Sequence, residues 1–277
     1  MAKTRWRASA SPAPESPRPS SVPLPLVVLA AAGAAFFVLP LIGLLLRAPW
    51  GTAWHELTST EALLALRLSF VASLSATGLA LIFGVPLAWI YARSTFPGRN
   101  VLRALTVLPM VLPPVVGGVA LLFAFGRRGI LGQWLDQAFG IHLPFSTAGA
   151  IIAETFVAMP FLIITVESGL NSMDRRFEDA ARTLGARPWT VMWRVTLPLV
   201  RPSLIAGAVL CWARALGEFG ATITFAGNFP GRTQTMPLAV YLALETNPDA
   251  AIVLSLVLLA VSLAVLVGLR DRWLGAS

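Results

Sequence analysis

The feature of this sequence that most constrains its fold is a series of six long apolar runs. A helix needs about 20 mostly apolar residues to cross a bilayer. Runs of this kind occupy residues 24–46, 66–92, 101–126, 148–170, 202–226 and 250–269. Only 12% of the 277 residues are charged, and a soluble protein carries about twice that share. We therefore predict an all-α fold, a polytopic membrane bundle with six transmembrane helices.

The distribution of basic residues predicts how these spans are oriented. With the N-terminus in the cytoplasm, 15 of the 21 Lys and Arg residues fall inside and 4 outside, and Arg67 and Arg214 lie within spans. Cytoplasmic loops of membrane proteins carry such an excess, so we expect both termini to be cytoplasmic. The same bias accounts for the net charge of +8, which therefore does not indicate a nucleic-acid partner.

The segments outside the spans suggest the domain organisation. Residues 1–22 are rich in Pro and Ser and are basic, which is typical of a disordered tail. We expect this tail to be cytoplasmic and residues 23–277 to form a single transmembrane domain. The longest polar stretch is the predicted inside loop at 171–201, and a loop of this length invites a functional role.

Several kinds of chemistry are missing from the sequence. A nucleotide-binding P-loop needs a lysine after its glycines, but the only lysine is Lys3. The single cysteine, Cys211, and two distant histidines give no typical metal-ligand set. We therefore expect no catalytic residue, no metal and no cofactor in this chain, and we expect a transporter rather than an enzyme. Active work would need an ion gradient or a partner that hydrolyses ATP.

The 171–201 loop is predicted to contain two short helices. Residues 174–184 favour a helix with Asp174 as its N-cap, and Gly185 ends it as the C′ residue. Pro188 fits the first turn of a second helix. This pattern by itself fits either an amphipathic loop on an anionic leaflet or a protrusion that docks into another protein.

The spacing in this loop resembles the EAA loop of ABC-importer permeases. Asp179-Ala180-Ala181 is followed after three residues by Gly185, and after nine more by the run Val195 to Pro198. The family pattern has Glu at the first of these positions and Ile at Val195. The resemblance implies a type I ABC-importer permease fold, in which this loop couples the permease to a separate ATPase. The coupling residues that it implies are Glu178, Asp179, Ala180, Ala181, Arg182, Gly185, Leu197 and Pro198.

Other segments are similar to the molybdate/tungstate permeases, namely 108–118, 212–228 and 231–241. The resemblance covers about residues 60 to 270. It implies an inner-membrane protein that moves molybdate or tungstate by alternating access and works as two copies within membrane lipid. The implied partners are two ATP-binding cassette subunits, which bind ATP and Mg²⁺, and a periplasmic oxyanion-binding protein. The alternatives are a sulfate-type permease, which has a similar layout, and an ion-coupled secondary carrier that acts alone.

Two spans contain residues that we expect along the translocation pathway. Prolines at 109, 113 and 114 should kink or unwind the third span, which is tolerated at membrane depth only against protein or a water-filled cavity. In the fifth span, Arg214, Glu218 and Thr222 are four residues apart and would form one polar stripe on a helix. Arg214 and Glu218 fit either the pathway or a structural ion pair. The full set of pathway or gate candidates is Pro109, Pro113, Pro114, Gly117, Gly118, Arg214, Glu218, Thr222 and Asn228.

Overall fold

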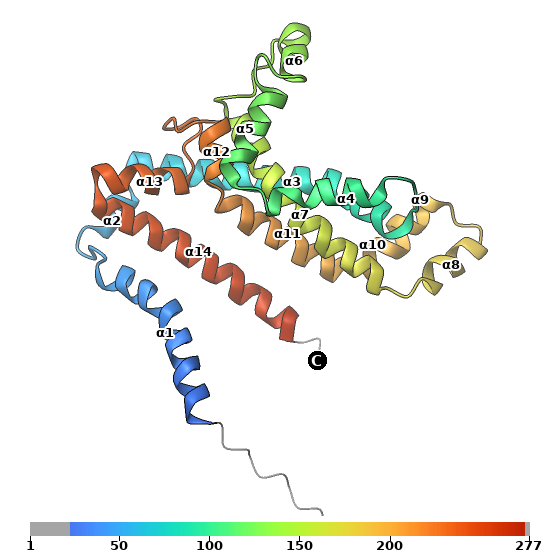
Figure 1. Cartoon of the computed structure of the whole chain (residues 1–277), viewed down its shortest axis with the longest axis horizontal. Coiled ribbons are helices and arrows are strands. Elements are labelled where there is room, and N and C mark those ends of the chain that lie inside the picture. Colours follow the sequence, from blue (N-terminus) through green and yellow to red (C-terminus); the bar gives the residue numbers. More distant parts are fainter. Residues whose placement is uncertain (1–22, 275–277) are drawn as a thin grey trace, which may run out of the picture. The chain divides into compact units, whose positions relative to one another are not determined.

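The computed structural model describes residues 23–274, with side chains up to residue 268, and every regular element in this range is a helix (Figure 1). The tail predicted at 1–22 lies outside these residues. Internal contacts divide the chain into two units, Met1–Leu46 and Arg47–Ser277. In the first unit, α1 (Leu24–Leu46) is one continuous apolar helix, long enough to cross a membrane.

The second unit holds the other elements. They are α2 (Ala53–Leu57), α3 (Thr60–Arg93), α4 (Arg99–Val107), the 3₁₀ turn η1 (Leu108–Met110), α5 (Pro114–Phe125), α6 (Gly132–Phe139), α7 (Thr147–Ser172), α8 (Arg176–Thr183), α9 (Pro188–Val191), the π-helical segment η2 (Met192–Thr196), α10 (Leu197–Leu199), α11 (Arg201–Leu216), α12 (Gly220–Phe225), α13 (Met236–Thr246) and α14 (Pro248–Leu274).

The candidate membrane spans number four to six among the described residues. Four are continuous: α1, α3, α7 and the Pro248–Gly268 part of α14. Two more are bent helix pairs. Arg99–Met110 meets Pro114–Phe125 at 119°, and Pro188–Leu199 meets Arg201–Leu216 at 76°. The predicted all-α membrane bundle is confirmed, and so is the break predicted in the third span.

Helix α3 is longer than the apolar run that predicts it. It has 34 residues, or about 50 Å at 1.5 Å per residue, whereas the hydrocarbon core of a bilayer is about 30 Å thick. Its start is set by Ser59, whose hydroxyl accepts the N–H of Ala62 at 3.2 Å. A helix of this length extends past the hydrocarbon core, which leaves Arg93, its last residue, free to make polar contacts.

The centre of the second unit is formed by α3, α7 and α11, which lie side by side (Figure 1). Helix α3 packs there through small residues such as Ala72, Ala76 and Ala80, all fully buried. In α11, a Cβ atom added at Gly207 would lie 3.3 Å from the carbonyl oxygen of Leu162 on α7. Small residues of this kind let helix backbones approach closely in a membrane.

Two smaller apolar clusters flank this centre. One joins the beginning of α3 to α13 and α14, and the other joins α5 and α12 to α7. The second cluster holds together α5, which is the second half of the broken third span, and α12, the short helix that follows α11.

Candidate functional site

The first helix predicted in the 171–201 loop forms as α8, and local contacts define both of its ends. A carboxylate oxygen of Asp174 accepts the N–H of Arg176 at 2.9 Å. The N-cap residue is Arg175, one position later than the cap predicted at Asp174. At the other end, Gly185 has a φ of +85°. The N–H groups of Gly185 and Ala186 bond to carbonyls of the last turn, as in a Schellman motif. The predicted stop at Gly185 is therefore confirmed.

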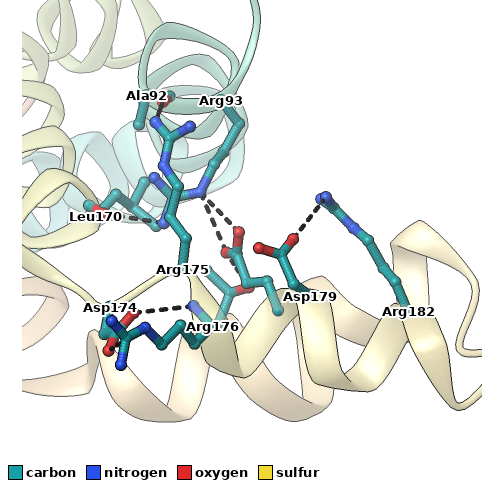
Figure 2. A network of polar contacts seen from close by, with 10 residues as sticks. Ala92, Arg93, Leu170, Asp174, Arg175, Arg176, Asp179 and Arg182 are labelled. Atoms are coloured by element: carbon teal, nitrogen blue, oxygen red, sulfur yellow. Dashed lines mark hydrogen bonds and ion pairs between the residues drawn. The ribbon is translucent and has the colours of Figure 1, made fainter.

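The neighbouring acidic residues of α8 differ sharply in burial. Glu178 is 2% exposed, whereas the side chain of Asp179 is 68% exposed and pairs with Arg182 at 3.5 Å (Figure 2). Phe177 and Leu184 also face outward, at 55% and 89% exposure. We call Phe177, Asp179, Arg182 and Leu184 the outward surface of α8; Ala180 and Gly185 are exposed beside it, and Ala181 is half-buried.

The inward side of α8 is anchored by Glu178. The Nε atom of Arg93, at the end of α3, lies 2.9 Å from Oε2 and 3.2 Å from Oε1 of Glu178. The hydroxyl of Thr196, in η2, donates to Oε1 at 2.8 Å. Thr196 is fully buried. Residues from three elements, distant in sequence, therefore meet at one carboxylate.

Two arginines also tie this loop to the ends of the long helices. Arg93 donates through Nη2 to the carbonyl of Leu170 in the last turn of α7 at 2.9 Å, and Arg175 donates to the carbonyl of Ala92 in α3 at 3.1 Å (Figure 2). Carbonyls of a last turn have no partner within their own helix, and cations are favourable at this end. The start of α8 is therefore fixed to α3 and α7.

The second predicted helix of the loop begins at Pro188 as expected, but it is not one regular α-helix. It consists of α9, the π-helical η2 and α10. Pro198 cannot donate to the carbonyl four residues before it, which removes one α-helical bond beside η2. Leu197 is half-buried and Pro198 is exposed.

The broken third span approaches α12 closely at two glycines, Gly118 of α5 and Gly220 of α12. After the 119° bend, Pro114 begins α5, with Pro113 at its N-cap. A Cβ atom at Gly118 would lie 2.6 Å from Cβ of Thr224 on α12, and one at Gly220 would lie 2.7 Å from Cβ of Pro114. We call this contact the α5–α12 junction.

The predicted polar stripe on the fifth span is wrong, because 202–226 is not one helix. Helix α11 ends at Leu216 and α12 begins at Gly220, with Glu218 in the break. Nη2 of Arg214 lies 2.7 Å from Oε2 of Glu218, and Oε1 accepts the N–H of Ala221 at 2.7 Å. The carboxylate thus caps the first turn of α12. It favours the start of a new helix at a point where the sequence predicted one continuous span.

The other pathway candidates are distributed over several elements. Gly117 is buried beside Phe156 of α7, and Pro109 is buried in η1, which packs on α7 rather than at the α5–α12 junction. Thr222 is fully buried on α12, and Asn228 follows that helix in a loop. The hydroxyl of Thr222 and the Oδ1 atom of Asn228 find no hydrogen-bond partner among the described residues.

Sequence reasoning missed Arg93 and Thr196 as functional candidates. Arg93 contributed only to the charge count, since its partner Glu178 is 85 residues away and no local pattern links them. Thr196 falls at the variable position of the loop pattern. Where the structure gives side chains, no group of three His, Cys, Asp or Glu residues is arranged to hold a metal ion.

The comparisons with known proteins agree along most of the chain. A family model described as "Binding-protein-dependent transport system inner membrane component" matches residues 80–275. The chain is 47% identical to the molybdenum transport system permease protein ModB of Mycobacterium tuberculosis over 256 residues, 92% of this chain and 96% of that one. It is 43% identical to the Escherichia coli protein of the same name over 206 residues, 73% of this chain and 90% of that one. The sulfate transport system permease protein CysT of Escherichia coli is 36% identical over 218 residues, 78% of each chain.

Solved structures show the same fold. A bacterial ABC transporter involved in the import of the acidic polysaccharide alginate superposes with a TM-score of 0.68 at 19% identity, covering 90% of this chain and 92% of that one. A bacterial alginate ABC transporter in complex with an alginate pentasaccharide-bound periplasmic protein gives a TM-score of 0.66 at 18% identity, covering 87% and 91%.

Proposed function

The chain belongs to the family of binding-protein-dependent transport system inner membrane components, and we propose that it is the permease through which an ATP-driven importer moves molybdate or tungstate. The observation that supports this substrate is the 47% identity of the chain to a molybdenum permease over nearly the full length of both proteins. Identity to the sulfate permease is lower and covers less of the chain, so sulfate is the second candidate.

Coupling to a separate ATPase subunit is supported by the geometry of α8. Its outward surface presents apolar and charged side chains together, with Leu184 and Phe177 more than half exposed. Its start is stabilised by the contact of Asp174 with the N–H of Arg176, and its end by the left-handed turn at Gly185. In this proposal Asp179, Ala180, Ala181, Arg182 and Gly185 contact the ATPase, Leu197 and Pro198 carry the second part of the loop, and Glu178 supports the helix from within.

The proposed assembly has two copies of this chain, two ATP-binding cassette subunits and a periplasmic oxyanion-binding protein. ATP and Mg²⁺ would be bound by the cassette subunits, since this chain has no P-loop lysine. Large exposed apolar side chains on the broken third span, such as Val111 at 81% and Phe123 at 75%, need cover from membrane lipid or from the second copy. Both termini would lie in the cytoplasm, as the distribution of Lys and Arg predicts.

The pathway for the anion would use the broken spans. Helix breaks at membrane depth occur where the backbone is buried in protein or lines a cavity, and α5, α11 and α12 are all bounded by such breaks. Arg214 keeps 27% of its side chain exposed while Glu218 is fully buried, so the guanidinium is the accessible member of the pair. A partly neutralised cation suits transit, because an anion that binds too tightly would not leave.

The test is transport by the complete complex. The chain is co-expressed with its ATPase and binding protein, reconstituted in proteoliposomes and supplied with labelled molybdate. We expect uptake that requires ATP hydrolysis and the binding protein, with competition strongest from tungstate and weakest from sulfate.

Two results would contradict this proposal. Uptake by the chain alone, driven by an ion gradient and indifferent to the ATPase, would identify a secondary carrier. Competition in which sulfate displaces molybdate at the lowest concentration would identify a sulfate-type permease.

A further inference from the structure

The carboxylate of Glu178 joins α8 to two other parts of the fold. Its side chain is 3% exposed and that of Arg93 is 5% exposed. The Glu178 carboxylate accepts hydrogen bonds from Arg93 at the end of α3 and from Thr196 in η2. We call Arg93, Glu178 and Thr196 the α8 anchor. The spacing pattern of the loop contains no such connection, since Arg93 lies far outside it.

A buried ion pair of this kind acts on geometry more than on stability. Removing two charges from water costs about as much as their attraction returns, whereas losing one partner leaves an uncompensated buried charge. The pair therefore persists only when α8 lies at one position and orientation against α3. By contrast, the exposed Asp179–Arg182 pair lies within α8 and does not restrain the helix against the rest of the fold.

The α8 anchor is continuous with the core of the membrane bundle. Arg93 also bonds the last turn of α7 through the carbonyl of Leu170. Thr196 lies in the π-helical segment that leads through α10 into α11, and π-helical turns are frequent at functional sites. One carboxylate on α8 is thereby linked to α3, α7 and α11, the three helices that pack together at the centre of the second unit.

We propose that Glu178 is the positioning residue of the coupling helix. Through Arg93 and Thr196 it makes α8 move as one piece with the ends of α3, α7 and α11, so that a displacement of α8 by the ATPase reaches the membrane bundle. Without this connection the loop flexes and ATP is hydrolysed without transport. The inference rests on the proposed ATPase coupling of this chain.

The experiment measures anion imported per ATP hydrolysed by the reconstituted complex. In E178Q the complex assembles and hydrolyses ATP, while the ratio falls about fivefold, within the range by which coupling residues change linked equilibria. T196V, which removes one hydrogen bond, gives a smaller fall. R93M/E178L replaces the pair with apolar side chains, leaves no unpaired charge and lowers the ratio as E178Q does.

The matched control is E167Q. Glu167 on α7 is also buried and pairs with an arginine, Arg103, at 3.1 Å, but this pair does not involve α8. We expect E167Q to keep the wild-type ratio. A wild-type ratio in R93M/E178L overturns the proposal. Failure of R93M/E178L to assemble while E167Q assembles also overturns it, because the α8 anchor then serves folding alone. A wild-type complex without ATP-dependent uptake refutes the proposed function instead.

Discussion

Glu178 and Asp179 are adjacent and carry the same charge, but they have different roles because one is buried and the other exposed. Glu178 holds α8 against α3 and η2, and Asp179 remains available on the outward surface. A few residues later, Gly185 turns the chain with a φ of +85°. At this scale, the conformation of the loop depends on burial and on single backbone angles.

Replacing Gly185 with Val should uncouple ATP hydrolysis from uptake. A left-handed conformation costs an L-residue roughly 1–2 kcal/mol, and a β-branched side chain adds further strain, so the end of α8 should shift. Uptake per ATP in proteoliposomes is the measurement. Gly185→Asn is the control, since Asn tolerates this conformation. Normal assembly and uptake in the Val variant would count against a coupling role for this turn.

Replacing Arg214 should reveal whether it pairs structurally or guides the anion. R214Q alone leaves Glu218 buried and charged, which costs about 3–5 kcal/mol. R214Q/E218Q removes both charges and should recover most of that stability, as thermal denaturation of the complex would show. We expect molybdate uptake to stay low in the double variant. Recovery of uptake together with stability would assign the pair a structural role only.

At the scale of helices, prolines and glycines decide how the broken spans fold. Pro113 and Pro114 end one helix and begin another, and α5, with 12 residues, is too short to cross a bilayer alone. Its partner is α12, which approaches closely because Gly118 and Gly220 have no side chains. The two short helices therefore stabilise one another through the α5–α12 junction.

Replacing Gly118 with Ala should destabilise the complex. The new methyl group would lie 2.6 Å from Cβ of Thr224 and 2.9 Å from the carbonyl oxygen of Ala221, and overpacking of this kind costs about 1–3 kcal/mol. Thermal denaturation of the purified complex would detect the loss. Gly78→Ala in α3 is the matched control, because a Cβ atom there meets nothing within 4 Å. Equal denaturation temperatures for the two variants would show that the junction is not tightly packed.

At the scale of the whole molecule, the arginines predict how the bundle is inserted. Fifteen of the 21 basic residues fall on the side predicted to be cytoplasmic, and the 171–201 loop contributes six of them. The same side must face the ATPase if α8 is the coupling helix. The orientation predicted from the arginines and the proposed contact of α8 with an ATPase therefore require the same side of the protein to be cytoplasmic.

Single cysteines should report this orientation. Arg128→Cys lies in an exposed segment on the predicted outside, and Asn171→Cys is exposed at the start of the 171–201 loop. A membrane-impermeant maleimide should label the first in intact cells and the second only after permeabilisation. The native Cys211 is fully buried and should stay unlabelled. The reverse pattern would mean that the termini are outside.

The fold class and much of the 171–201 loop were predictable because they depend on local properties. Apolar runs identified all the long helices, and the ends of α8 depend on contacts between residues at most a few positions apart. The break between α11 and α12 was not predicted, because 202–226 is apolar overall and the glycines that flank the break, Gly217 and Gly220, do not by themselves end a helix. It forms where the Glu218 carboxylate bonds the N–H of Ala221, a contact that a continuous helix would not allow.

By itself, the sequence determined a polytopic helical membrane protein and the stop of α8 at Gly185, since hydropathy and backbone preference act over short stretches. It also predicted an orientation from the placement of the arginines. Only the tertiary structure decided which of two adjacent carboxylates faces inward and what it meets there. The partner of Glu178 is Arg93, 85 residues away, and only the packing of α3, α7 and α11 brings the two together. Burial then makes that contact specific, because a charge removed from water needs its partner at a defined position.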